Sequence, residues 1–491
     1  MKKFLKAFVL IIIACAFVLV GCTPQGLTEN PAETAVSIGN GGSTVIKGDY
    51  MYYINGFVDY TTLTNRKTDN VFGKVTTGAI YRAKLVDGKI DKDEDGFVNN
   101  TEVVVPKVVG FKNGGFYIYG NSIYYTTPHM NENKGGVVQN QLIEFHKINI
   151  DGTNDVTLFY IGEEVTSFDW SIYRIDGVDY IVAFTGTKIY IHNATHNASV
   201  TTISDVTSTA LIKNNNFDMN NFSNSATLSK KLYYTRDYAG EEKASDSYTG
   251  NVVSFVDIAT GDITTAKVSS DYKYTIKNAK NGYLFYTKAI TNEQTYYFVN
   301  KLNNTFNNSV EVQISSLPFT QIMVADNSSN ADQILVVGAY GESGSSLWVV
   351  KGTFEDGLGT PKQLLNSSVT MESIVGDTLI YSSDSNLYAI NYMDVYSSGS
   401  ATPRTLNENK AMATDKLSVD FDGRYVTFMY EYTSANSTKS YYLNYIDTFD
   451  TSSTPRFLGQ FAESDKPTKP EQNTYDDDYP EELKEYIPWI D

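Results

Sequence analysis

The sequence predicts an all-β fold, a β-propeller of about eight blades. The first observation is that the 491 residues include 37 Tyr, and segments rich in Tyr, Val, Ile and Thr show no long run with the period of a helix. The second is that Asp-Gly turns separate these segments, as at Asp87-Gly88, Asp176-Gly177 and Asp422-Gly423. The third is a repeat at a spacing of roughly 45 to 60 residues, which is typical of propeller blades.

The repeat is a turn followed by a short apolar or aromatic strand. Its eight copies are GDYMYYIN, GNSIYYTTP, DGVDYIVAF, SKKLYYTRD, NGYLFYTKA, ADQILVVGA, GDTLIYSSD and DGRYVTFMY, centred near Tyr53, Tyr125, Ala183, Tyr234, Tyr286, Val336, Tyr381 and Val426. A second β segment follows each copy, as AIYRAKL follows the first and LIEFHKI the second. One such unit cannot bury its faces alone, whereas packing the units radially buries them.

Blade number and ring closure stay open at this point. A long insertion, FVDYTTLTNRKTDNVFGKVTTG, follows the first copy of the repeat. A seven-bladed ring with one irregular unit is therefore the alternative to eight blades. A ring also needs a closing contact between its first and last units, and residues 34–39 are a candidate for a closing strand.

The second unit carries a family resemblance. Its segments GNSIYYTTP and HKINIDGTNDVTLF resemble the YWTD-type propellers of low-density-lipoprotein-receptor proteins and related propellers of bacterial surface lipoproteins. The family pattern is a turn Gly, a Tyr-aromatic-Thr-Asp strand and an Arg/Lys-x-Asn-x-Asp-Gly-Thr/Ser segment. The resemblance covers roughly Gly41 to Phe461 as a repeat pattern, and most units lack the Trp. It implies a scaffold whose loops are free to bind, without a eukaryotic receptor role.

The N-terminus predicts a lipid anchor. Three lysines lie within the first six residues, and the apolar stretch Phe8–Val20 that follows is shorter than the roughly 20 residues of a membrane span. The stretch leads into Gly21-Cys22, and the segment LVGC resembles the bacterial lipobox. This resemblance implies removal of residues 1–21 as a signal peptide, acylation of Cys22 and attachment to the extracytoplasmic side of a bacterial cell membrane.

The rest of the chain divides by composition. Residues 22–40 are polar, with Gly and Pro, and predict a lipidated flexible stalk. Residues 41–462 contain the repeats and predict the propeller. Residues 463–491 predict an acidic tail with Pro and Tyr, either without fixed structure or docked on the protein's own surface; a partner-binding peptide within it is the alternative.

Charge and cysteine content exclude several function classes. The formal net charge is -18, and loss of the three N-terminal lysines makes it -18 - 3 = -21. Such a surface repels nucleic acid, which is therefore not an expected partner. The sequence has 2 Cys; Cys15 would be removed with the signal peptide and Cys22 lipidated. Thiol catalysis and disulfides are then excluded from the mature chain.

The segment DKDEDGFVNNTE, residues 91–102, matches the acidic loop that binds Ca²⁺ in helix–loop–helix proteins. The predicted ligands are the side chains of Asp91, Asp93, Asp95, Asn99 and Glu102 and the carbonyl of Phe97. Both flanks of the loop are β-like, so we expect it between strands of the first blade, with a structural ion and no sensor function. The alternative is a solvated acidic hairpin turn.

The other chemical motifs are weaker. His192 and His196 have the i, i+4 spacing of a helical metal pair but follow a strand, which predicts solvated turn histidines. His129 and His146 have no neighbouring Cys or carboxylate cluster in the sequence, so catalysis by them is not predicted. The segment GESGSS fails the spacing of a nucleophile elbow, and SSDSNLY occurs once, without the glycine of a sialidase turn.

These observations favour a membrane-anchored binding scaffold over an enzyme. No catalytic residues are predicted, and the expected ligand is an extracellular glycan, peptide or protein. One alternative is an extracytoplasmic glycoside hydrolase or lyase that uses two carboxylates, whose separation the sequence does not give. A second alternative is an envelope assembly factor.

Overall fold

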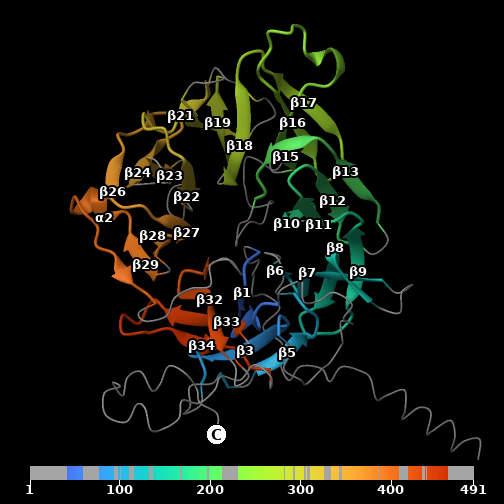
Figure 1. Ribbon diagram of the computed structural model, residues 1–491, viewed down its shortest axis with the longest axis vertical. Helices are drawn as coiled ribbons and strands as arrows, with labels where there is room; N and C mark the ends of the chain where they lie inside the picture. Colours follow the sequence, from blue (N-terminus) through green and yellow to red (C-terminus); the bar gives the residue numbers. More distant parts are fainter. Residues whose placement is uncertain are drawn as a thin grey trace, which may run out of the picture.

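The chain forms an eight-bladed β-propeller in a computed structural model (Figure 1). Eight antiparallel sheets follow one another in sequence around a ring, which confirms the predicted fold and excludes the seven-bladed alternative. The structure describes residues 41–462 apart from 59–76, 93–97, 100, 110–114, 132–136, 166–167, 196–197, 213–229, 281, 291–293, 303–305, 307–309, 326–332, 342–345, 385, 408–418, 434–436 and 438.

The first four blades run from the blue to the green part of the ring in Figure 1. Blade 1 contains β1 (Thr44–Lys47), β2 (Tyr50–Ile54), β3 (Ile80–Val86), β4 (Lys89–Ile90) and β5 (Thr101–Val105). Blade 2 contains β6 (Phe116–Tyr119), β7 (Ser122–Asn131), β8 (Val137–Asn149) and β9 (Val156–Ile161). Blade 3 contains β10 (Asp169–Ile175), β11 (Val178–Phe184), β12 (Ile189–Asn193) and β13 (Val200–Ile203). Blade 4 contains β14 (Val206–Thr209), β15 (Lys231–Arg236), β16 (Val252–Asp257) and β17 (Ile263–Val268).

The last four blades complete the ring. Blade 5 contains β18 (Lys273–Lys280), β19 (Tyr283–Ala289), β20 (Tyr296–Lys301) and β21 (Val312–Gln313). Blade 6 contains β22 (Gln321–Val324), β23 (Gln333–Tyr340), β24 (Ser346–Thr353), β25 (Gly357–Leu358) and β26 (Lys362–Leu365). Blade 7 contains β27 (Thr370–Val375), β28 (Thr378–Ser383), β29 (Asn386–Asn391) and β30 (Arg404–Thr405). Blade 8 contains β31 (Asp420–Phe421), β32 (Tyr425–Thr433), β33 (Lys439–Asp447) and β34 (Arg456–Leu458).

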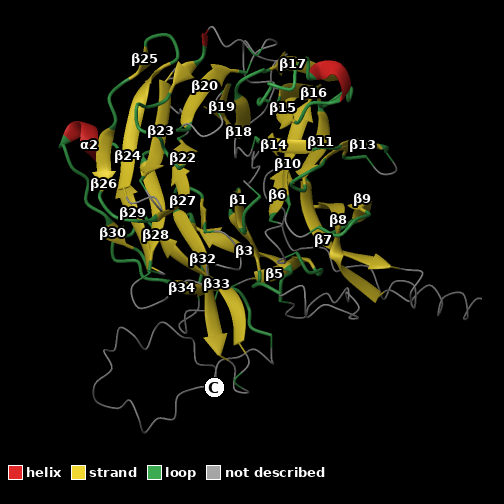
Figure 2. Ribbon diagram, turned by 45° about the horizontal axis from the view of Figure 1, so that its top comes forward, coloured by secondary structure: helices red, strands yellow, loops and turns green. Residues whose placement is uncertain are grey.

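Helices are few and short in the described part of the chain (Figure 2). They are the 3₁₀ helix η4 (Gly240–Glu242) and the α-helix α2 (Asp394–Ser397). Neither these nor any other described helix has the length and apolar character needed to cross a bilayer.

The repeat found in the sequence is the second strand of every blade. Its eight predicted centres fall in β2, β7, β11, β15, β19, β23, β28 and β32, and the second β segment after each copy is the third strand. The middle residues of these second strands are almost all buried, as Tyr53 and Tyr125 are. A central strand is covered on both faces by neighbouring blades, which explains its run of Tyr, Val and Ile.

Buried tyrosines join neighbouring blades. The Tyr117 hydroxyl in β6 donates to the carbonyl of Trp170 in β10 at 2.7 Å, and the two rings meet edge to face at 4.7 Å. The Tyr173 hydroxyl in β10 accepts a hydrogen bond from the Ile212 backbone N–H beyond β14. A tyrosine fills the space between blades and satisfies a buried backbone group at the same time.

The ring closes through contacts between blades 8 and 1, which meet in the lower part of Figure 1. Each sheet consists of consecutive strands, so in the described part of the chain no strand is shared between the first and last blades. The predicted closing strand, residues 34–39, lies outside the described residues. Asn55 and Gln460 instead exchange two hydrogen bonds across the junction, of 2.9 and 3.0 Å. A Cβ on Gly459 would lie 2.4 Å from Asn55 Oδ1, so only glycine fits there.

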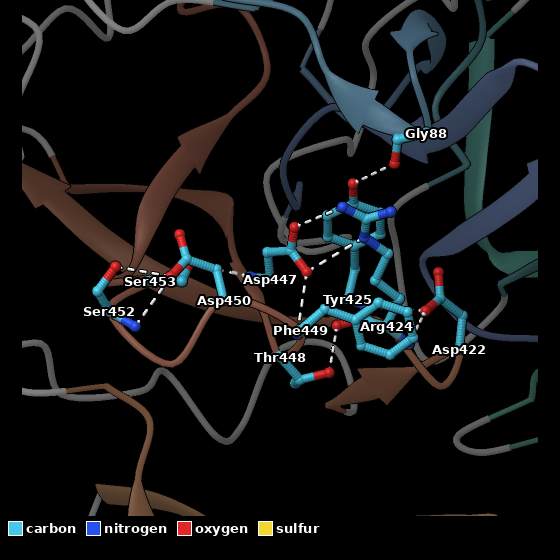
Figure 3. A network of polar contacts seen from close by, with 10 residues as sticks. All are labelled: Gly88, Asp422, Arg424, Tyr425, Asp447, Thr448, Phe449, Asp450, Ser452 and Ser453. Atoms are coloured by element: carbon cyan, nitrogen blue, oxygen red, sulfur yellow. Dashed lines mark hydrogen bonds and ion pairs between the residues drawn. The ribbon is translucent and has the colours of Figure 1, made fainter.

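A polar network supports one end of this junction (Figure 3). The Tyr425 hydroxyl of blade 8 donates to the carbonyl of Gly88 in blade 1 at 2.8 Å. Next to it, the Arg424 guanidinium forms two hydrogen bonds with the Asp447 carboxylate. Asp422 Oδ1 accepts the backbone N–H groups of Arg424 and Tyr425. These hydrogen bonds fix the turn before β32 and the turn after β33 relative to each other, next to blade 1.

Candidate functional site

A pocket of about 600 Å³ lies between blades 5 and 6. The residues that line it are Lys277, Thr287, Gln294, Thr295, Tyr297, Pro318, Phe319, Thr320, Tyr340 and Gly341. They come from β18, the end of β19, the start of β20, the connection into β22 and the end of β23. Most of them belong to loops and strand ends, where variation in sequence leaves the sheets intact.

The pocket lining combines aromatic rings with polar side chains that have spare hydrogen-bonding capacity. The Thr287 side chain is 6% exposed and has no hydrogen-bond partner among the described residues. Gln294 accepts one hydrogen bond, from the Tyr296 hydroxyl, which leaves its amide group to donate. The rings of Tyr297, Phe319 and Tyr340 supply the apolar surface. A few polar groups among aromatic rings are the usual composition of a ligand pocket.

A second group of polar residues occupies one face of blade 2. Glu144 and His146 lie on β8, and His129 on the neighbouring strand β7. Glu144 accepts from both histidines, at 2.5 Å from His129 Nδ1 and 2.7 Å from His146 Nε2. His146 Nδ1 in turn lies 3.0 Å from Asp155 Oδ1. The side chains thus form a chain in the order Asp155, His146, Glu144, His129, which we call the blade 2 relay.

The relay is charged and mostly buried. Carboxylate oxygens accept only, so both nitrogens of His146 must carry hydrogen for both contacts to be hydrogen bonds. Burial alone would raise the pKa of Glu144, but hydrogen bonds and charge from His146, with hydrogen bonds from His129 and Thr157, lower it to about 2. Burial likewise opposes ionisation of Asp155, whereas His146 and Lys107 hold the pKa of Asp155 well below its usual range. Both carboxylates are therefore ionised at neutral pH.

His129 and Asp155 are the two partly exposed ends of the relay. The His129 side chain is 19% exposed, and its ring stacks on the exposed ring of Tyr160 at 4.2 Å. Glu144 fixes Nδ1, and in the described part of the chain Nε2 has no hydrogen-bond partner. A histidine held by a carboxylate at one nitrogen can take or give a proton at the other. The prediction that His129 and His146 lack neighbouring carboxylates is therefore wrong.

The acidic loop lies between strands of blade 1, as predicted. An isolated bridge between Lys92 and Val98 closes it, and the Asn99 N–H donates to the Asp91 carbonyl at 2.9 Å. The predicted ligands Asp93, Asp95 and Phe97 lie outside the described residues. Among the residues that the structure does describe, no group of three or more His, Cys, Asp or Glu is arranged to hold a metal ion.

The predicted ligand Glu102 has another partner. Its Oε2 accepts from Arg82 Nε at 2.8 Å and from Nη2 at 2.6 Å, and the Arg82 side chain is fully buried. Asp91 and Asn99 are brought together at the base of the loop, whereas coordination through both oxygens of Glu102 would compete with this ion pair. The described residues therefore fit a Ca²⁺ site in part. The predicted lipidation site, Cys22, lies outside the described residues.

The prediction for His192 is wrong. His192 lies within β12, is 0% exposed and stacks on Phe159 at 4.7 Å; it is not a solvated turn residue. Burial lowers its pKa. The strand β12 continues through Asn193 and so includes His192, while His196 lies outside the described residues. The segment GESGSS follows β23, and the next described element is the strand β24 instead of the helix that a nucleophile elbow would need; SSDSNLY spans the end of β28 and the start of β29.

Sequence reasoning missed the pocket and the relay for the same reason. Lys277 and Tyr340 come from separate strands, β18 and β23, and no local pattern predicts that they line one pocket. In the relay, Pro128 pairs with Ile143 but His129 pairs with Gln139, because the register shifts between them. One local pattern did indicate the relay. Glu144 and His146 are separated by one residue, Phe145, and residues two apart in a strand lie on the same face.

The comparisons with known proteins show fold-level likeness alone. No family model and no curated protein matches the chain. An oligogalacturonate lyase in complex with manganese is 10% identical, with 77% of this chain and 96% of that chain covered and a TM-score of 0.39. A puromycin hydrolase complexed with PGG is 11% identical, with 72% and 53% covered and a TM-score of 0.42. TolB from Acinetobacter baumannii is 15% identical, with 50% and 56% covered and a TM-score of 0.27.

This chain spans about half the length of the puromycin hydrolase and TolB chains that it matches. Identities of 10 to 15% and TM-scores below 0.5 give no argument about activity, substrate or partner. The resemblance to YWTD-type propellers stays a prediction, since no family model matches. The order of strands in the eight sheets shows by itself that the chain is an eight-bladed β-propeller.

Proposed function

We propose that this protein is a lipid-anchored, extracytoplasmic binding propeller whose ligand, a glycan or an extended peptide, occupies the pocket between blades 5 and 6. One observation carries the proposal: the pocket combines three aromatic rings with polar groups, Thr287 and Gln294 among them, that have hydrogen bonds left to make. A ligand that pairs with these groups gains hydrogen bonds that they do not already make within the described part of the protein.

The anchor and the ion belong to the same proposal. Acylation of Cys22 and a stalk over residues 22–40 would hold the propeller outside the cell membrane. A Ca²⁺ ion at the acidic loop would stabilise the first blade beside the closure of the ring, because Lys92 of this loop lies 4.6 Å above the Tyr445 ring of blade 8. The extracellular concentration of Ca²⁺ is near millimolar, so even a loop that binds Ca²⁺ weakly would be occupied there.

Ligand binding to the pocket is tested with the full chain, purified in detergent, on arrays of glycans and peptides. The Tyr340→Ala variant removes a ring of the pocket, and Phe449→Ala removes an exposed ring elsewhere, on blade 8. We expect retention of a ligand by the wild type and by Phe449→Ala, with at least a roughly tenfold loss for Tyr340→Ala. Equal retention by both folded variants would place the ligand elsewhere and contradict the proposal.

Acid–base catalysis at the blade 2 relay is a second candidate function. The observation in its favour is the arrangement of His129, with Nδ1 held by Glu144 and Nε2 open. A rate that is lost in a folded His129→Gln variant would support catalysis. A substrate screen in which His129→Gln and the wild type give the same rates would exclude it.

A further inference from the structure

We propose that the pocket between blades 5 and 6 binds a saccharide that carries a carboxylate, and that Lys277 pairs with this carboxylate. The inference rests on the proposed function, because it names the ligand class of the same pocket. Of the described residues that line the pocket, only Lys277 has a formal charge. Among the described lining residues, a ligand that fills the pocket therefore meets one cation and no anion.

The local backbone sets Lys277 apart from its strand. The pairing of β18 with β19 shifts register between Ile276 and Asn278, so Lys277 is the extra residue of a β-bulge. A bulge re-aims the side chain of its extra residue, and bulges are over-represented beside binding sites. Lys277 is exposed, and its side chain lines the pocket instead of following the alternation of the strand.

Three other lysines of blade 5 have partners, whereas Lys277, like the exposed Lys273 of the same strand, has none among the described residues. Lys288 pairs with Glu311, and Lys301 with Glu355 at 2.5 Å. The ammonium group of Lys280 donates to the Val324 carbonyl at 3.0 Å. For Lys277 no ion pair or hydrogen bond exists within the described residues. In a chain of net charge -18, a lysine without a carboxylate partner at a pocket is available for an anion from outside.

The remaining lining favours a sugar as the carrier of that carboxylate. Hydroxyl and amide groups of Thr287, Thr295 and Gln294 can pair with ring hydroxyls as both donors and acceptors. The ring of Tyr340 is partly exposed and can pack against the C–H side of a sugar ring, while the buried ring of Tyr297 forms part of the pocket wall. A pocket of about 600 Å³ is large enough for a short oligosaccharide.

The net charge limits how anionic the ligand is. A surface of charge -18 repels densely charged polyanions at long range. One unpaired ammonium matches one carboxylate, which fits a short uronate-bearing sugar better than a heavily sulfated or phosphorylated chain. Screening by salt acts on this exposed pair, so binding weakens as ionic strength rises.

The test is calorimetry of the full chain with tetrasaccharides of glucuronate, galacturonate and mannuronate, each beside its methyl ester. The ester keeps the sugar skeleton and removes the charge. We expect one of the acids to bind at least about tenfold more tightly than its ester, as a charge-assisted hydrogen bond implies. Lys277→Met should abolish this preference. Lys273→Met is the matched control, because Lys273 is an exposed lysine of the same strand outside the pocket.

The outcomes separate this inference from the proposed function. Equal affinity for acid and ester, unchanged in Lys277→Met but lost in Tyr340→Ala, would overturn the role of Lys277 and keep the pocket as a sugar site. Binding of peptides with a terminal carboxylate, and of no saccharide, would overturn the sugar class. No binding of any of these probes, together with no effect of Tyr340→Ala in the array experiment, would overturn both.

Discussion

Asp420, in the innermost strand of blade 8, accepts two hydrogen bonds from Thr44, in the innermost strand of blade 1. The backbone N–H and the hydroxyl of Thr44 both lie 3.1 Å from Asp420 Oδ2, and 376 residues separate the pair. Asp420 is 4% exposed. The pair therefore links the beginning and the end of the ring at its centre.

The first prediction is that Asp420→Ala destabilises the fold. The substitution leaves two buried donors of Thr44 without their acceptor, at a cost of about 2 to 3 kcal/mol in the free energy of unfolding. Urea denaturation followed by tyrosine fluorescence measures it. The control is Asp246→Ala on the surface, where a change within about 0.5 kcal/mol is expected. Equal stability of the two variants would show that the pair does not hold the ring closed.

The second prediction concerns Asp422. Burial raises the pKa of this carboxyl to about 6, despite the two backbone N–H groups that it accepts, and its Oδ2 is buried without a partner. The folded state therefore favours the protonated form, so a cost of up to about 3 kcal/mol appears as the pH rises from about 4 to about 6 and persists above.

Asp422→Asn keeps an acceptor for the two backbone groups and removes the charge. We expect it to raise the melting temperature at neutral pH and to flatten the change in stability between about pH 4 and pH 6. Thermal melts across this range, monitored by circular dichroism, make the comparison. A variant that is less stable than the wild type at neutral pH would contradict the assignment of a buried, costly charge.

The third prediction concerns Glu144, whose charge stabilises the folded state, whereas the charge of Asp422 destabilises it. Because Glu144 has its pKa lowered to about 2, its ionised form stabilises the fold above pH 4.5, and this contribution is lost as the pH falls through the range 4.5 to 2. Glu144→Gln should therefore lose up to about 3 kcal/mol at pH 7, with a smaller difference at about pH 3. Urea unfolding of the wild type and the variant at both pH values measures this difference in the free energy of unfolding. If the difference is as large at the lower pH as at pH 7, the relay does not stabilise the fold through the charge of Glu144.

The fourth prediction uses a glycine behind the pocket. A Cβ on Gly338 in β23 would lie 2.4 Å from Cδ2 of Phe319, so Gly338→Ala must move this ring, which lines the pocket. We expect weaker ligand binding with the fold retained. Gly376→Ala, in blade 7 and outside the pocket, is the control for a general loss of stability, because a Cβ there meets nothing within 4 Å but φ is positive. Equal loss of binding in both variants would contradict an effect through Phe319.

The fifth prediction concerns calcium. Titration of the full chain with Ca²⁺ should show binding that Asp93→Ala abolishes, and chelation should lower the melting temperature. Asp91→Ala should weaken binding too, because Asp91 lies at the base of the loop beside Asn99. Absence of heat, together with a melting temperature that chelator leaves unchanged, would make the segment a solvated hairpin.

Local pattern was enough to place Tyr53 and Tyr125 on second strands, because a strand buried on both faces has a distinctive composition over a few residues. It was not enough for His129 and Glu144, whose contact depends on the pairing of β7 with β8, which places Thr127 opposite Glu144. Lys277 is likewise brought to the pocket by a bulge and by the packing of two blades. His192 was misplaced because the end of a strand is set by its neighbours and not by its own residues.

Each sheet is formed by one continuous segment of the chain, and this has a consequence for how the number of blades can change in evolution. A whole blade can be gained or lost by duplication or deletion of one stretch of DNA, since no sheet takes strands from both ends of the chain in the described residues. New termini placed in any connection between blades would likewise leave every sheet in one piece. Each blade is then one contiguous segment of the chain, although the blades differ in strand number and in the contacts that each makes with the next.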